Sequence, residues 1–323
     1  MIKVSILVPV YGVEAFIERC ARSLMEQTYP NIEYIFVDDC SPDNSISILQ
    51  SVIDEYHRDD VTIIRHETNK GLGGARKTAL LAASGDYILN VDSDDYLEKT
   101  AVSLLVEEIV KRQADVVKLS CFMEWCNTKK AYYGAWNENA HQYTKLLLSA
   151  KTLPGVCLHI IRRTLYFEHH LFPTEGINLG EDFILTPRLC YYANCIGHVD
   201  EPIYHYIQTN SSSYTSSFNA KKVEDLSHVA NTLYEFFKDK PDFLYALNEG
   251  MWQKKVEMML NCKLQNYKLV DTLPTWLPVS TGSMRLEQRI AAPLVAKKLW
   301  YALWLYSITY NFVFRIVQKL KGR

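Results

Sequence analysis

Short apolar runs alternate with helical segments up to about residue 125, and this alternation constrains the fold more than any other feature of the 323-residue chain. The apolar runs have the β-branched composition of buried strands, and the segments between them have helical spacing. The expected strands cover residues 4–10, 31–37, 61–65, 87–91 and 116–121, and the expected helices cover 14–27, 46–56, 75–84 and 97–113. Repeated β-α-β units predict an α/β fold whose mostly parallel sheet has helices on both faces.

Polar clusters follow four of these elements, at residues 9–14, 38–41, 69–76 and 92–95. Ligands of open parallel sheets bind beyond the carboxyl ends of the strands, so the four clusters are expected to converge at one edge. The last cluster lies in NVDSDDYL, where Asp92, Asp94 and Asp95 follow an apolar run. Carboxylates this close repel one another, and a divalent cation with oxygen ligands, Mg²⁺ or Mn²⁺, would balance them.

The geometry of an extended segment predicts separate roles for the aspartates. Side chains alternate along a strand, so Asp92 and Asp94 are expected on one side, where one carboxylate reaches a metal and the other a ribose hydroxyl. Asp95 is expected to point elsewhere and cap the next helix. Acidic triplets are also common in solvated turns, but the preceding apolar strand with Gly85-Asp86 favours a site.

Beyond residue 125 the alternation stops. Residues 127–143 are expected to be loops over the site, and 150–167 a mixture of a short helix and strands. An apolar helix is expected at 183–193, a serine-rich loop at 210–217, and helices across 219–270.

The C-terminal tail contains an uncharged apolar stretch at 299–314, with Lys297 and Lys298 before it and Arg315, Lys319, Lys321 and Arg323 after it. As a helix this stretch is roughly 24 Å long at about 1.5 Å per residue. That is short of the roughly 30 Å hydrocarbon core of a bilayer. Its Trp and Tyr residues favour the membrane surface, and the alternative is a helix packed on its own domain or on a dimer partner.

Composition and absent motifs exclude several classes of protein. The formal net charge of -2 gives no indication of a nucleic-acid partner. No GxGxxG or GxxxxGK[ST] motif is present, which argues against dinucleotide oxidoreductases and P-loop kinases. YGVEAF, after the first strand, is not the glycine-rich basic loop of a sugar nucleotidyltransferase. The N-terminus lacks the features of a signal peptide, so the eight cysteines, none in a CxxC motif, are expected to be free thiols in the cytosol.

Three stretches resemble glycosyltransferase family 2 of the bacterial surface-polysaccharide type: VSILVPVYGVEAFIERCARSLMEQTYPNIEYIFVDDCSPDNS, NKGLGGARKTAL and SGDYILNVDSDD. The resemblance is close up to about residue 125 and then thins to GED at 180–182 and EPIYHY at 201–206. It implies a GT-A fold and a metal-dependent, inverting transfer of one sugar from a nucleotide-sugar to a hydroxyl of a glycan or lipid-linked glycan precursor. The QxxRW signature of processive synthases is absent, which favours addition of a single sugar.

The resemblance also implies roles for individual residues. Asp39 matches the aspartate that hydrogen-bonds the uracil edge, so UDP is the favoured nucleotide, and Asp94 is the expected ligand of Mn²⁺ or Mg²⁺. Gly12 stands where the family usually has Asn, and Lys77 replaces another Asn. The full set of expected nucleotide-sugar residues is Pro9, Tyr11, Glu14, Asp39, Ser41, Gly71, Arg76 and Asp92.

Asp182 matches the catalytic base of the family. Inversion needs a base that takes the proton of the acceptor hydroxyl on the face opposite the leaving diphosphate, a contribution of about 10²–10⁴-fold. Glu181 is the rival base, and either carboxylate also suits the first turn of a helix. His205 is expected to be a third metal ligand or an ordinary core residue. Ile207 stands where relatives often carry Arg, so Gln208 or the serines at 211–213 are expected to replace part of the diphosphate contact.

The expected organisation is a GT-A catalytic domain at 1–218, a helical extension at 219–292 and a basic, aromatic tail at 293–323. The protein is expected to work in the cytoplasm on the inner face of the cell membrane, with a homodimer as a further possibility. Two alternative functions stay open: a catalytically silent protein that binds nucleotide-sugars or glycans, and a transferase to polyprenyl phosphate.

Overall fold

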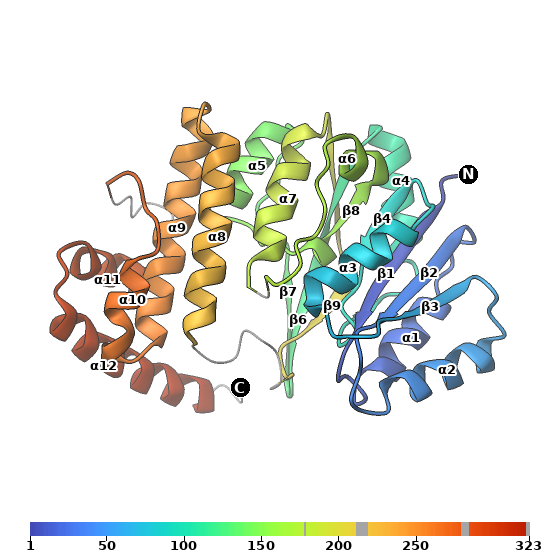
Figure 1. The fold of residues 1–323 in the computed structure, drawn as a ribbon, viewed down its shortest axis with the longest axis horizontal. Coiled ribbons are helices and arrows are strands. Elements are labelled where there is room, and N and C mark those ends of the chain that lie inside the picture. Colours follow the sequence, from blue (N-terminus) through green and yellow to red (C-terminus); the bar gives the residue numbers. More distant parts are fainter. Residues whose placement is uncertain (178, 211–218, 279–283, 321–323) are drawn as a thin grey trace.

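A single mixed sheet forms the centre of the computed structural model, which describes residues 1–177, 179–210, 219–278 and 284–320, with side chains up to residue 313 (Figure 1). Over these residues the strand order is β3-β2-β1-β4-β8-β6-β9-β5, with β7 paired to β6. The strands are β1 (Val4–Val10), β2 (Ile32–Asp38), β3 (Val61–Arg65), β4 (Tyr87–Asn90), β5 (Tyr96–Leu97), β6 (Val116–Trp125), β7 (Thr128–Tyr132), β8 (His159–Arg162) and β9 (Ile196–Ile207).

The first four strands of this order are parallel, and their carboxyl ends lie at one edge of the sheet. β8 runs antiparallel to both of its neighbours, β4 and β6, whereas β9 is parallel to β6 and antiparallel to β5. Every residue of β1 is buried, as expected for a parallel strand covered on both faces. The expected α/β architecture is therefore confirmed. The part of the sheet from β3 to β4 is parallel, as expected, and the remaining part also contains antiparallel pairs.

Helices cover both faces of the sheet. α1 (Ile17–Met25), α2 (Ser45–Tyr56) and α4 (Ala101–Arg112) share one core with the sheet. A second core, on the other face, includes α3 (Gly71–Ala82), α5 (Ala140–Leu148), α6 (Arg163–Glu168) and α7 (Glu181–Tyr192). Alternation along β1 explains the division, because Ile6 and Val8 enter the first core and Leu7 enters the second.

Long helices extend this second layer away from β3 (Figure 1). They are α8 (Ala220–Phe237), α9 (Pro241–Asn261), α10 (Tyr267–Asp271), α11 (Leu286–Ala296) and α12 (Trp300–Leu320), with the 3₁₀ turn η3 (Leu264–Asn266) before α10. A further 3₁₀ turn, η1 (Val156–Leu158), precedes β8 and packs on the sheet. Leu233 of α8 and Leu247 of α9 belong to the second core, while Val256, Ala292 and Leu303 belong to a third core among the C-terminal helices. No helix within the described ranges is both long and apolar enough to cross a membrane.

Three expected boundaries differ in the structure. α3 begins at Gly71, so the glycines form its first turn instead of preceding it. A Cβ at Gly73 would lie 2.0 Å from the carbonyl oxygen of Thr174, which explains why glycine is needed inside this turn. Residues 127–143 are not only loops, because β7 forms a hairpin with β6 and α5 begins at Ala140. α4 begins at Ala101, since residues 96–97 pair with β9 as β5.

The predicted boundaries of three domains, at residues 218 and 292, stay a prediction. The first falls in the segment 211–218, which lies outside the described residues, as does most of the expected serine-rich loop. All eight cysteines are free thiols.

Candidate active site

A tight turn carries the three aspartates at the carboxyl end of β4. The backbone N–H of Asp95 donates to the carbonyl oxygen of Asp92 at 3.0 Å, so the segment turns directly after the strand. The expected extended geometry, with Asp92 and Asp94 on one side, is therefore wrong. The turn brings Asp92 and Asp95 together instead and leaves Asp94 at its tip.

Asp95 is buried and anchors the turn to β9. Its Oδ1 accepts the backbone N–H of Ile207 at 2.7 Å, and its Oδ2 accepts the hydroxyl of Tyr204 at 2.6 Å. The same hydroxyl accepts the backbone N–H of Asp92 at 3.2 Å. Burial, Asp94 and Asp92 raise the pKa of Asp95 well above its ordinary value. Asp95 does not cap the following helix as expected, because α4 begins six residues later, at Ala101.

Asp94 is half-buried at the tip of the turn. Its Oδ2 accepts the side-chain amide of Asn210 at 2.9 Å. Burial, followed by the negative charge of Asp92, raises the pKa of Asp94 above its ordinary value. A carboxylate held near other carboxylates in this way is stabilised by any cation that binds beside it.

Arg76 supplies the permanent positive charge of the site. It comes from α3, is only 4% exposed, and donates through Nη2 to Asp92 at 2.6 Å and through Nη1 to Glu181 at 2.5 Å. Burial opposes the charge, but Asp92 and Glu181 outweigh burial, so the pKa of Arg76 stays above its ordinary value. The guanidinium therefore links two segments that are far apart in the sequence, at the end of β4 and the start of α7.

Glu181 and Asp182 are the first two residues of α7, and they differ in environment. Glu181 is buried against Arg76, and burial together with the charge of Asp182 raises its pKa. Asp182 is partly exposed and accepts the backbone N–H of Phe183 at 2.6 Å through Oδ1. Both line a small cavity with Arg76, Asn90 and Tyr166. Of the two candidate bases, only Glu181 forms an ion pair among the described residues, with Arg76.

The expected nucleotide residues gather at the neighbouring strand ends. The carboxylate of Asp39, directly after β2, accepts the backbone N–H groups of Lys70 and Gly71, both at 2.8 Å. Its Oδ1 also lies 2.7 Å from Nδ1 of His66. Gly71 has a φ of +73°, which suits glycine and lets its N–H face this carboxylate. Asp39 therefore holds the start of α3, and with it Arg76, in place.

Glu14 and Ser41 hold the loops around this end of the cleft. Glu14 accepts the backbone N–H of Asn44 at 3.0 Å, while its own backbone N–H donates to Asp43 at 2.9 Å. The hydroxyl of Ser41 donates to the carbonyl of Val10 at 3.3 Å. Pro9 lies within β1, and the ring of Tyr11 is 54% exposed beyond its end. The structure thus brings the expected nucleotide residues to the ends of β1, β2 and α3.

His205 lies on the opposite side of β9 from the aspartate turn. Successive side chains of a strand point to opposite faces, and Tyr204 faces Asp95. The two ring nitrogens of His205 lie 2.6 Å from Glu124 and 2.9 Å from Glu98. The structure therefore does not bring His205 to Asp94, and metal ligation by His205 stays a prediction.

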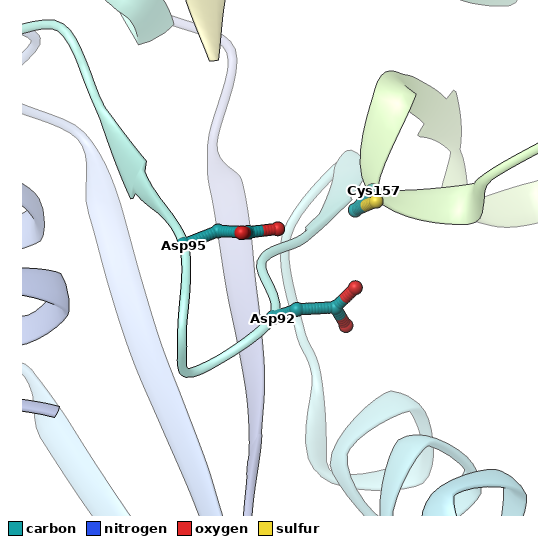
Figure 2. A group of neighbouring side chains, drawn as sticks. All are labelled: Asp92, Asp95 and Cys157. Atoms are coloured by element: carbon teal, nitrogen blue, oxygen red, sulfur yellow. The ribbon is translucent and has the colours of Figure 1, made fainter. Parts of the chain in front are cut away.

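One group of side chains within the described residues has the spacing of a metal site. A carboxylate oxygen of Asp92, one of Asp95 and the Sγ of Cys157 all lie within 4.8 Å of one another. In Figure 2 the two carboxylates point from one loop toward the side where Cys157 lies. Carboxylate oxygens suit Mg²⁺ and Mn²⁺, so the aspartate turn fits a divalent cation of the expected kind. Asp94 is not part of this group, and its role as a ligand stays a prediction.

Sequence reasoning missed Tyr204, Asn210 and Cys157. The segment containing Tyr204 was singled out, but His205 was chosen from it. Alternation along a strand could have shown that residues 204 and 205 face opposite sides. Asn210 and Cys157 reach the aspartates only through the tertiary fold, and no local pattern marks them. The serines at 211–213, which were expected with Gln208 to replace part of the diphosphate contact, lie outside the described residues.

Comparisons with known proteins identify the family and the fold of the chain. The family model described as Glycosyl transferase family 2 matches residues 5–166, which is half of the chain. EpsJ of Bacillus subtilis, described as an uncharacterized glycosyltransferase, is 33% identical over 218 residues, covering 65% of this chain and 62% of EpsJ. The chain thus spans less than two thirds of the length of this relative.

Two solved structures share the fold. Residues 1–349 of TarS from S. aureus, in complex with UDP-GlcNAc, align with a TM-score of 0.73 and 21% identity over 96% of this chain and 91% of that TarS fragment. The mannosyltransferase PcManGT from Pyrobaculum calidifontis, in complex with GDP-Man and Mn²⁺, aligns with a TM-score of 0.57 and 16% identity over the whole chain and 88% of PcManGT. The fold is GT-A, and the chain belongs to glycosyl transferase family 2.

Proposed function

We propose that this protein transfers one sugar, with inversion, from a nucleotide-sugar to a hydroxyl of a glycan or lipid-linked glycan precursor. One observation carries the proposal: Arg76 joins Asp92 at the end of β4 to Glu181 beside Asp182. Asp39 holds the start of the helix that carries Arg76. The groups proposed to act on the donor and on the acceptor are thus linked through Arg76, next to the strand ends where ligands of such sheets bind.

The favoured donor is a UDP-sugar. TarS, which shares the fold, binds UDP-GlcNAc, and the matching position for a uracil contact is Asp39. Among the described residues Oδ2 of Asp39 receives one hydrogen bond, from Gly71, so this oxygen retains capacity to accept a further N–H. The exposed ring of Tyr11 provides a surface for stacking a base, worth roughly 1–3 kcal/mol per base in nucleic-acid sites.

We propose that Asp94 holds Mn²⁺ or Mg²⁺. The partly exposed tip of the turn leaves Asp94 open to a ligand, while both oxygens of Asp95 already accept hydrogen bonds. A bound cation of this kind stabilises the negative charge of a leaving diphosphate. The structural neighbour PcManGT is in complex with GDP-Man and Mn²⁺. The group of Asp92, Asp95 and Cys157 is the alternative ligand set.

Asp182 is proposed as the base that removes the proton of the acceptor hydroxyl. Glu181 is the weaker candidate, because its carboxylate is bound to Arg76 and buried. Asp182 is more exposed and lines the same cavity. Glu181 then serves to position Arg76, which in turn orients Asp92.

The acceptor is proposed to be carried by a lipid, with the enzyme working at the inner face of the cell membrane. The cationic, aromatic C-terminal end supports this location by its composition.

A donor panel tests the proposal. Purified full-length protein is incubated with UDP-, GDP- and dTDP-sugars in Mn²⁺, in Mg²⁺ and in chelator, and free nucleotide is measured. We expect slow, metal-dependent hydrolysis of at least one UDP-sugar, and inverted anomeric configuration in any transfer product. Binding of a nucleotide-sugar without any turnover would instead support the catalytically silent alternative. Loss of metal dependence in Cys157→Ser, with Asp94→Asn unaffected, would select the alternative ligand set.

A further inference from the structure

An exposed apolar row runs along α12. Tyr301, Leu305, Ile308 and Phe312 are 76%, 60%, 49% and 65% exposed, and their spacing of four, three and four residues places them on one side of the helix. Such large apolar side chains are rarely left together on the surface of a soluble protein without a binding partner. α11, the preceding helix, also exposes Leu286 and Ile290.

The opposite side of α12 is fixed to the protein. Leu303 is fully buried in the third core, and Asn311 donates to the carbonyl of Leu260 in α9 at 3.0 Å. The hydroxyl of Tyr306 donates to the carbonyl of Glu287 at 3.2 Å. These contacts hold the helix in place, so the apolar row cannot turn inward without breaking the third core. Truncation at residue 293 would expose that core and would not isolate the function of the row.

The charge around α12 indicates what covers the row. After Glu287 the sequence contains seven Lys and Arg residues and no Asp or Glu, although the whole chain has a formal net charge of -2. Lys297 is exposed just before α12, and Lys298 pairs with Asp271 at 2.8 Å. An apolar row with cations at both ends of its helix matches the boundary of an anionic lipid leaflet, where tails accept the row and headgroups accept the cations.

A second copy of the chain fits this surface less well. Pairing two copies along α12 would bring the cationic end of one helix against a cationic end of the other, in either orientation. Like charges facing each other across an interface oppose association. We therefore propose that the row Tyr301, Leu305, Ile308 and Phe312 docks on anionic membrane, with α12 lying along its surface.

The apolar row is formed by residues of α12 and does not depend on the proposed reaction. α12 lies at the end of the molecule opposite β3 (Figure 1). The row shares no residue with the candidate active site, so membrane binding and donor turnover can be tested separately.

Vesicle co-sedimentation of the full chain tests the surface. The vesicles are phosphatidylcholine alone or phosphatidylcholine mixed with phosphatidylglycerol. We expect binding to the mixed vesicles, weakened by high salt, and much less binding to phosphatidylcholine alone. Leu305→Glu with Phe312→Glu should weaken binding at least on the order of tenfold, since two apolar side chains can no longer leave water.

A matched control separates this effect from added charge. Leu81 and Val110 are 58% and 56% exposed on α3 and α4, so Leu81→Glu with Val110→Glu adds the same charge to another surface. This control should bind vesicles like the unmodified chain, and thermal melting should show that both variants fold. Vesicle binding that survives Leu305→Glu with Phe312→Glu would overturn the proposal. The proposal would also be overturned if the unmodified chain did not bind vesicles but formed a dimer, and if Leu305→Glu with Phe312→Glu dissociated that dimer. A second copy of the chain would then cover the row.

Discussion

Removing Arg76 should expose how strongly the site depends on one buried cation. Its guanidinium is 4% exposed and makes ion pairs of 2.6 Å with Asp92 and 2.5 Å with Glu181. Arg76→Met keeps a similar length but leaves these two carboxylates near Asp182 without their shared partner. Breaking a buried pair by removing one member typically costs about 3–5 kcal/mol of unfolding free energy.

Glu181→Gln should cost less than Arg76→Met. Burial and the charge of Asp182 raise the pKa of Glu181, which means that this position favours a neutral side chain. The neutral side chain of Glu181→Gln should therefore destabilise the fold less than the unpaired carboxylates left by Arg76→Met. In the double variant, Arg76→Met no longer leaves a buried carboxylate at position 181. We therefore expect the double variant to be more stable than the sum of the single effects by about 1–3 kcal/mol.

Urea denaturation of the four proteins measures this coupling directly. The free energy of unfolding is extrapolated to water for the unmodified chain, both single variants and the double variant, at one neutral pH. Effects that add to within about 0.5 kcal/mol would refute the reasoning, because Arg76 and Glu181 would then not act as a pair.

Three further predictions concern the metal, the base and acid stability. Asp94→Asn should fold normally, since the residue lies at the tip of a surface turn, but lose most of its activation by Mn²⁺; full activity in chelator would contradict its role as a ligand. Asp182→Asn should keep UDP affinity while the rate of transfer falls by on the order of 10²-fold or more. If only Glu181→Gln shows this pattern, Glu181 is the base and the assignment of Asp182 is wrong. Burial lowers the pKa of His159 from 6.5 to about 3, so the unfolded chain takes up a proton first and stability is lost as the pH falls from 6.5 toward 3. His159→Gln should therefore lose about 2 kcal/mol less unfolding free energy than the unmodified chain between about pH 7.5 and pH 5, measured by urea denaturation; equal losses would show that His159 is not the group responsible.

The N-terminal half could be predicted from sequence because its signals are local. β1 and β3 occupy the expected residues 4–10 and 61–65, which are rich in β-branched side chains; β1 is wholly buried, and β3 is the partly exposed edge strand. α3 was expected to begin after its glycines because glycine normally weakens a helix. The close approach of Thr174 to Gly73 reversed that preference, and this contact comes from a segment about 100 residues away.

The sequence predicted which residues gather at the site better than it predicted the contacts between them. Motif order placed Asp39, Arg76, Asp92 and Asp182 near one edge, as the structure has them. The turn at residues 92–95 depends on Tyr204 and on the backbone of Ile207, which pattern alone cannot bring to Asp95. His205 shows the same difficulty, because the side of the strand that it faces is decided by the register of β9 against β5 and β6.

Calorimetric titration of UDP into the full chain, with Mn²⁺ and then with chelator, tests the central claim most directly. The claim is that the ends of β1, β2 and β4 form a nucleotide-sugar site whose carboxylates hold a divalent cation. We predict saturable binding of one UDP per chain in Mn²⁺ and much weaker binding after chelation, with Asp94→Asn resembling the chelated protein. Absence of UDP binding under both conditions, or equal affinity with and without the cation in every variant, would contradict the claim.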